Sequence, residues 1–113
     1  MSARNSVRLV GRLGQDAQVN HNPDGTRVVN VSMATSEKRK NTSGDYVDHA
    51  EWHKIVFWNN LADIIGEYGT KGKEISVEGV LRTRSYENNE GKKVYVTEVI
   101  VNDLALLGSK SDA

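Results

Sequence analysis

Two tryptophans with a lysine between them are the residues whose types and spacing most suggest chemistry. Lys54 follows Trp52 by two positions, and Trp58 follows Lys54 by four. The aromatic and β-branched residues of segment 50–58 predict a strand, so these three side chains share one face. A core face would exclude the lysine, and an ordinary solvent face would not carry two tryptophans. The combination is typical of a surface that stacks bases and neutralises phosphate.

The opposite face of the same segment is suited to a protein core, because it ends in the apolar residues Ile55 and Phe57. The alternative interpretation is a strand buried on both faces, from which the long stem of Lys54 carries its ammonium group to water. Both interpretations fit the segment taken alone, and the rest of the chain has to separate them.

A second segment repeats this mixture of aromatic and cationic residues. In the strand predicted over residues 74–86, Arg82, Arg84 and Tyr86 share the face opposite to an apolar one. Phosphate contacts from the two arginines and stacking on the tyrosine would extend the first surface. The alternative is a solvated strand face on which Glu98 acts as a partner of the arginines.

Three consecutive cations lie in the polar loop predicted over residues 37–49. They are Lys38, Arg39 and Lys40. Cations that neutralise phosphates release counterions, so these residues are further candidates for phosphate contacts. A cluster that is simply solvated is an equally good interpretation.

Composition limits these hypotheses. The 113 residues suffice for one domain with a hydrophobic core. The chain has 15 Lys plus Arg and 15 Asp plus Glu, so nucleic-acid binding would depend on where charges are placed and not on an excess. It has no cysteine and hence no disulfide framework. Neither a membrane-spanning apolar run nor a signal-peptide core is visible, and we expect a soluble cytoplasmic protein.

The order of the predicted elements indicates the fold. Strands are predicted over residues 7–13, 28–34, 50–58, 74–86 and 94–107. A short helix over residues 61–68, with Asn60 as its N-cap, separates the third strand from the fourth. This order predicts an all-β, five-stranded OB-fold, which is a partly open Greek-key barrel. We expect this domain to cover residues 1–108 and a short flexible C-terminal end to cover residues 109–113.

Catalytic and metal-binding groups are not evident. His49, Glu51 and His53 would share one strand face and could mimic a metal site, but no cysteine or second cluster supports one. No catalytic Ser-His-Asp set or carboxylate pair stands at a familiar spacing. We therefore expect a protein that is not an enzyme and uses neither a metal nor another cofactor.

Five segments, in order and at plausible spacing, resemble bacterial single-stranded DNA-binding protein. They are residues 9–16, 34–37, 51–54, 77–84 and 97–102. The resemblance covers nearly the whole chain. It implies a homotetramer of OB-folds that coats single-stranded DNA without sequence preference, in replication, recombination and repair, in the cytoplasm and at the nucleoid.

The resemblance also assigns roles to residues at matching positions: base stacking to Trp52, Trp58 and Tyr86, contact with the DNA backbone to Arg82 and Arg84, and a place in the subunit interface to His53.

Two features depart from the family pattern. Where many members carry a further tryptophan, this chain has Lys38, Arg39 and Lys40, so charge replaces one stacking residue. The family usually continues into a tail with an acidic, aromatic tip that recruits partner proteins, and the sequence ends at Ala113 without one. Recruitment of partners through a tail is therefore not supported.

Two other functions remain open from the residues alone. One is a module for single-stranded RNA or for replication restart, which would use the same aromatic and cationic surface. The other is a structural oligomer in which the aromatic faces are subunit contacts.

Overall fold

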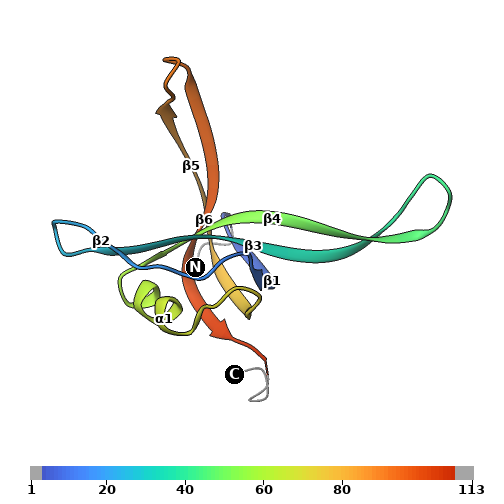
Figure 1. Cartoon of the computed structure of the whole chain (residues 1–113). Coiled ribbons are helices and arrows are strands. Elements are labelled where there is room, and N and C mark those ends of the chain that lie inside the picture. The colour runs from blue at the N-terminus through green and yellow to red at the C-terminus, as the bar shows by residue number, and fades with distance from the viewer. Residues whose placement is uncertain (1–3, 109–113) are drawn as a thin grey trace.

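The computed structural model describes residues 4–108, which form a β-barrel with one helix (Figure 1). The strands are β1 (Val7–Leu13), β2 (Asn20–His21), β3 (Arg27–Lys40), β4 (Tyr46–Trp58), β5 (Glu74–Glu87) and β6 (Lys93–Leu106). Helix α1 (Asn60–Tyr68) lies between β4 and β5. Within the described residues, no helix is long and apolar enough to cross a membrane.

Five strands close the barrel in the order β1-β5-β6-β4-β3, and β1 pairs with β3 to complete the ring. Strands β4 and β6 are parallel, and the other pairs are antiparallel. Closure needs a glycine at position 11, because a Cβ there would collide with the backbone carbonyl of Ala34 on β3. The two-residue β2 only extends the edge of β3. The predicted all-β, five-stranded OB-fold with one short helix is confirmed.

Alternate residues of the barrel strands fill the core, as strand geometry requires. The largest fully buried side chains are Phe57, Met33, Ile55, Ile65, Ile75, Val29 and Val77. Helix α1 contributes Ala62 and Ile65 to the same cluster, so it packs against the barrel. The prediction that Ile55 and Phe57 face the core is confirmed.

Two hairpins extend well beyond the barrel, one formed by β3 and β4 and the other by β5 and β6 (Figure 1). The polar loop predicted over residues 37–49 was wrong, because residues 37–40 continue the β3–β4 ladder against residues 46–49. Only residues 41–45 form the turn, in which the Asn41 side chain accepts two backbone N–H groups. Backbone pairing therefore extends the strands into a polar segment that sequence pattern assigns to a loop.

The start of α1 differs from the prediction, because Asn59 and not Asn60 is the N-cap residue. Asn59 adopts a left-handed φ of 54°, and its side-chain oxygen accepts the backbone N–H of Arg27. The Arg27 guanidinium donates to both carboxylate oxygens of Asp63 in the first turn of α1. These hydrogen bonds lower the pKa of Asp63. Together with the bond to Asn59, they connect β3 to the start of α1 and so hold the backbone in place where β4 ends.

Candidate nucleic-acid interface

The outer face of β4 carries the two tryptophans of the chain. Trp52 is 60% exposed, Trp58 is 42% exposed, and Lys54 between them is also exposed. Val56 shares their alternation but is buried, because it lies between Asn30 of β3 and Ile100 of β6. The strand is therefore not buried on both faces, and its aromatic rings are open to a ligand.

The ring of Trp52 lies against the loop that follows β1. A Cβ placed on Gly14 would come 2.7 Å from Cζ3 of Trp52 and 2.6 Å from the Ser32 hydroxyl. The Ser32 hydroxyl in turn donates to the side-chain oxygen of Gln15, 2.6 Å away. The absence of a side chain at position 14 thus makes room for the tryptophan, and this loop sets the position of its ring.

The β5–β6 hairpin presents the second predicted group. Arg82, Arg84 and Tyr86 are exposed and alternate onto one face of β5. The Arg84 Nε donates to Glu98 Oε1 across the hairpin at 2.9 Å, so the partnership with Glu98 that the alternative interpretation named is present for one of the two arginines. Within residues 4–108, the Arg82 side chain has no hydrogen bond or ion pair.

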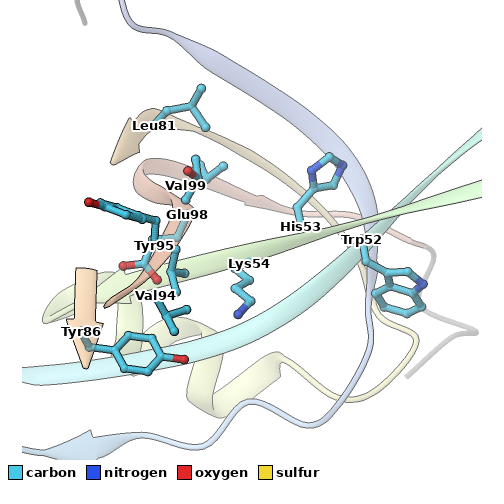
Figure 2. Close-up of a pocket in the computed structure, with 11 residues that line it drawn as sticks. Trp52, His53, Lys54, Leu81, Tyr86, Val94, Tyr95, Glu98 and Val99 are labelled. Carbon is cyan, nitrogen blue, oxygen red and sulfur yellow. The ribbon is translucent and has the colours of Figure 1, made fainter. Parts of the chain in front are cut away.

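A hollow of about 410 Å³ joins these two groups where β4 and β6 diverge. Trp52, Lys54 and Tyr86 all line it, and the Tyr86 ring extends from the hairpin toward Lys54 (Figure 2). We call Trp52, Lys54, Trp58, Arg82, Arg84 and Tyr86 the aromatic–basic face. The Lys54 side chain also has no hydrogen bond or ion pair with the described residues. Its charge and that of Arg82 are therefore available to an anionic ligand.

The three consecutive cations lie further out on the β3–β4 hairpin. Lys38 pairs in register with Asp48, four residues beyond the Ala34↔Trp52 pair, or roughly 13 Å along the strand. Its ammonium group is 3.6 Å from the Asp48 carboxylate, and Arg39 binds Glu37 at 2.9 Å. Lys40 precedes the turn. These cations are exposed but stand apart from the 410 Å³ hollow, so their role in binding phosphate stays a prediction.

His53 lies half-buried on the other face of β4, where its Nε2 is 2.9 Å from the Thr35 hydroxyl. Its proposed place in a subunit interface stays a prediction. The neighbouring His49 is bonded to Glu51 at 2.9 Å, which lowers the pKa of that carboxyl group. No group of three or more potential metal ligands occurs within residues 4–108.

Sequence reasoning missed residues that β6 brings to the hollow. Tyr95 is 67% exposed and lines it together with Val94 and Val96. The ammonium group of Lys93 lies 5.8 Å from the centre of the Tyr95 ring. The alternation of residues 93–96 was visible in the sequence, but nothing there placed this segment beside β4.

A closed barrel with aromatic and cationic side chains on one outer face is the OB-fold class of nucleic-acid-binding domain. The model of the single-strand binding protein family matches residues 4–107, and the chain belongs to this family. Members of this family bind DNA and are not enzymes. The resemblance inferred from five sequence segments is thereby confirmed.

Individual relatives agree with this assignment. The chain is 41% identical over 113 residues to single-stranded DNA-binding protein 1 of Xylella fastidiosa (strain 9a5c), across 99% of this chain and 83% of the relative. It is 44% identical over 107 residues to single-stranded DNA-binding protein 1 of Chlorobaculum tepidum, across 94% of this chain and 66% of the relative.

A solved structure described as Plasmodium falciparum SSB complex with ssDNA is also similar, with a TM-score of 0.85 and 29% identity. The similarity covers 96% of this chain and 98% of that chain, so it extends over the barrel and both hairpins.

Proposed function

We propose that this protein binds single-stranded DNA without sequence preference and performs no catalysis. The observation that carries the proposal is the aromatic–basic face, where exposed rings stand beside the unpaired cations Lys54 and Arg82. Every base has a π-face, so stacking on tryptophan and tyrosine tolerates any sequence. Family membership and the similarity to an SSB–ssDNA complex support the same function.

In this mechanism Trp52, Trp58 and Tyr86 stack on unpaired bases, and nearby cations neutralise the phosphates between them. Lys54, Arg82 and Arg84 supply this charge, with Lys38, Arg39 and Lys40 available further along the β3–β4 hairpin. Each neutralised phosphate releases counterions, so affinity falls as salt rises. Duplex DNA binds poorly because its bases are already stacked on each other.

The oligomeric state and the biological setting are part of the proposal. Family membership favours a homotetramer that covers exposed strands during replication, recombination and repair in the cytoplasm, at the nucleoid. His53 on the inner face of β4 is our candidate for the subunit interface. Light scattering tests the assembly directly: a mass of four chains supports it, and a stable monomer contradicts it.

Tryptophan fluorescence tests the binding. The protein is titrated with oligo(dT), with a duplex of equal length and with a matched RNA strand, each at two salt concentrations. Strong quenching by the single DNA strand, reduced by salt and weaker with duplex, is expected. Stronger quenching by RNA would favour an RNA-binding module. Absence of quenching at low salt would mean that the rings are covered in the oligomer, and the proposal would fail.

A further inference from the structure

Glu98 is an unusual residue for a surface that attracts phosphate. Its exposed fraction is 8%, and it is the one charged residue classed as buried among residues 4–108. It stands opposite Arg82 in the β5–β6 ladder. Lys54 and Arg84 line, together with Glu98, a second hollow of about 300 Å³ on the same side of the barrel. A carboxylate therefore sits among the cations of the aromatic–basic face.

A buried negative charge at this place is costly in two ways. It is removed from water, which is unfavourable unless a partner compensates, and it repels the phosphates that the neighbouring cations attract. Its compensation among the described residues is one charge-assisted hydrogen bond, from Arg84 Nε to Glu98 Oε1 at 2.9 Å.

The bond uses the Nε–H of the Arg84 guanidinium and leaves its two terminal amino groups free. Nε is the donor to Glu98, and the Arg84 guanidinium has no other hydrogen bond or ion pair with residues 4–108. The Arg84 side chain remains 57% exposed, whereas that of Glu98 is only 9% exposed. Both terminal amino groups thus keep a fixed direction and can donate together to one phosphate, as a planar arginine fork does.

We propose that Glu98 is a positioning residue of the DNA interface, which holds Arg84 so that its two terminal amino groups meet a phosphate. The proposal rests on the proposed function and adds a role that acts entirely through Arg84. Arg82 lacks such a carboxylate bond and therefore keeps its rotamer freedom until DNA binds.

Two substitutions at position 98 separate positioning from simple repulsion. Glu98→Gln removes the charge but keeps a side-chain oxygen that accepts the Arg84 Nε–H, whereas Glu98→Ala removes both. Positioning predicts that the alanine variant binds oligo(dT) about threefold to tenfold more weakly than the glutamine variant. Simple repulsion predicts that both variants bind more tightly than the wild type and equally well.

The Arg84→Ala background shows whether the effect passes through Arg84. In that background the glutamine and alanine variants are expected to bind equally, since no guanidinium remains to be positioned. A difference that persists there would overturn the proposal, as would equal binding of the two variants when Arg84 is present. Glu78 provides the matched control, because it pairs with Arg8 at 2.6 Å on a different face, and its Gln and Ala variants are expected to bind like the wild type.

A second pair of variants tests the proposal even if Glu98→Ala does not fold. Arg84→Lys keeps the charge but lacks the planar fork that contacts a carboxylate on one edge and a phosphate on the other. It is expected to lose more affinity than Arg82→Lys, whose arginine has no carboxylate partner. Equal losses would contradict the proposal. If the wild type itself fails to bind oligo(dT), the proposed function fails first.

Discussion

Arginines and lysines occur on two outer faces of this barrel, and the two faces use them differently. On the β1 side, Arg8 binds Glu78 at 2.6 Å and Arg12 donates to the backbone carbonyl of Gly72 at 2.9 Å. Both side chains thus have partners within the protein. On the aromatic–basic face, Lys54 and Arg82 have no such partner within residues 4–108.

The surroundings of the cations differ as well. The outward residues of β1 pair with Glu74, Ser76 and Glu78 of β5, so acidic and small polar side chains surround the arginines there. The cations of the aromatic–basic face stand beside tryptophan and tyrosine rings. A chain with zero net charge can therefore present a local anion-binding surface, because carboxylates such as Glu78 pair with cations elsewhere and only Arg84 of the aromatic–basic face has a carboxylate partner within residues 4–108. Substitutions on each face can show whether this division is functional.

The largest effect is expected for Trp52→Ala, which removes the more exposed tryptophan from the aromatic–basic face. Loss of base stacking should weaken binding to oligo(dT) by roughly 1–3 kcal/mol. The measurement is a fluorescence anisotropy titration with a labelled oligonucleotide. The control is Tyr68→Ala, which removes an exposed ring of α1 away from that face and should leave binding unchanged. Equal losses of affinity in both variants would mean that the aromatic–basic face is not a specific DNA-binding surface.

A smaller loss of affinity for oligo(dT) is expected for Gly14→Val, which would displace the Trp52 ring from the side of the loop that follows β1. The added side chain would occupy the space beside Cζ3 of Trp52 and displace the ring from its present position. Binding should weaken by less than in Trp52→Ala, with an altered tryptophan emission in the free protein. In the Trp52→Ala background, the valine should cause no further loss. An additional loss there would mean that Gly14 acts by another route.

Lys54→Ala should change the salt dependence more than the affinity at low salt. Removing one phosphate contact is expected to flatten the slope of log affinity against log salt by about 0.7 for single strands. Arg8→Ala is the matched control on the β1 side, where the charge is already neutralised by Glu78. Titrations at several salt concentrations give both slopes. If the Arg8 variant flattened the slope as much, the cations of both faces would contribute equally and the comparison would break down.

The sequence predicted most of the barrel, because strand alternation and helical spacing are local properties. Segment 50–58 suggested an exposed aromatic face and a core face, although its residues alone also fitted a strand buried on both faces; the structure shows the exposed aromatic face, apart from buried Val56. The length of the β3–β4 hairpin was missed, because its polar residues are held by pairing between residues 37–40 and 46–49 and not by burial.

The parts of the site that were not predicted depend on contacts between distant segments. Gly14 accommodates the ring of Trp52, and Tyr95 enters the hollow from β6. The sequence suggested Glu98 as a partner of both arginines, but only the fold shows that Arg84 alone receives it and that the carboxylate is buried. A contact between segments far apart in the chain leaves no periodic signal in either of them.

The smallest effect on DNA binding is expected at an ion pair whose role is structural. Arg27 holds Asp63 at the start of α1, which lowers the pKa of that carboxyl group below its ordinary value of 3.8, with a smaller contribution from His21. A lowered pKa in the folded state favours folding above the ordinary value, and this contribution is lost as pH falls through the folded-state pKa. The stability advantage of the wild type over Asp63→Asn should therefore be present at neutral pH and shrink below about pH 4.

Melting temperatures of both proteins across this pH range measure that advantage, and the difference is expected to be small because the pair is partly exposed to solvent. Binding of oligo(dT) at neutral pH should be the same for both proteins, since the pair neutralises itself and lies outside the aromatic–basic face. A weaker affinity of Asp63→Asn at unchanged stability would mean that the junction transmits its geometry to Trp58 at the end of β4. Structural and DNA-binding cations would then be distinguished by the groups that they position and not by the face on which they lie. Glu98 is an example of a residue whose proposed role depends on the group that it positions.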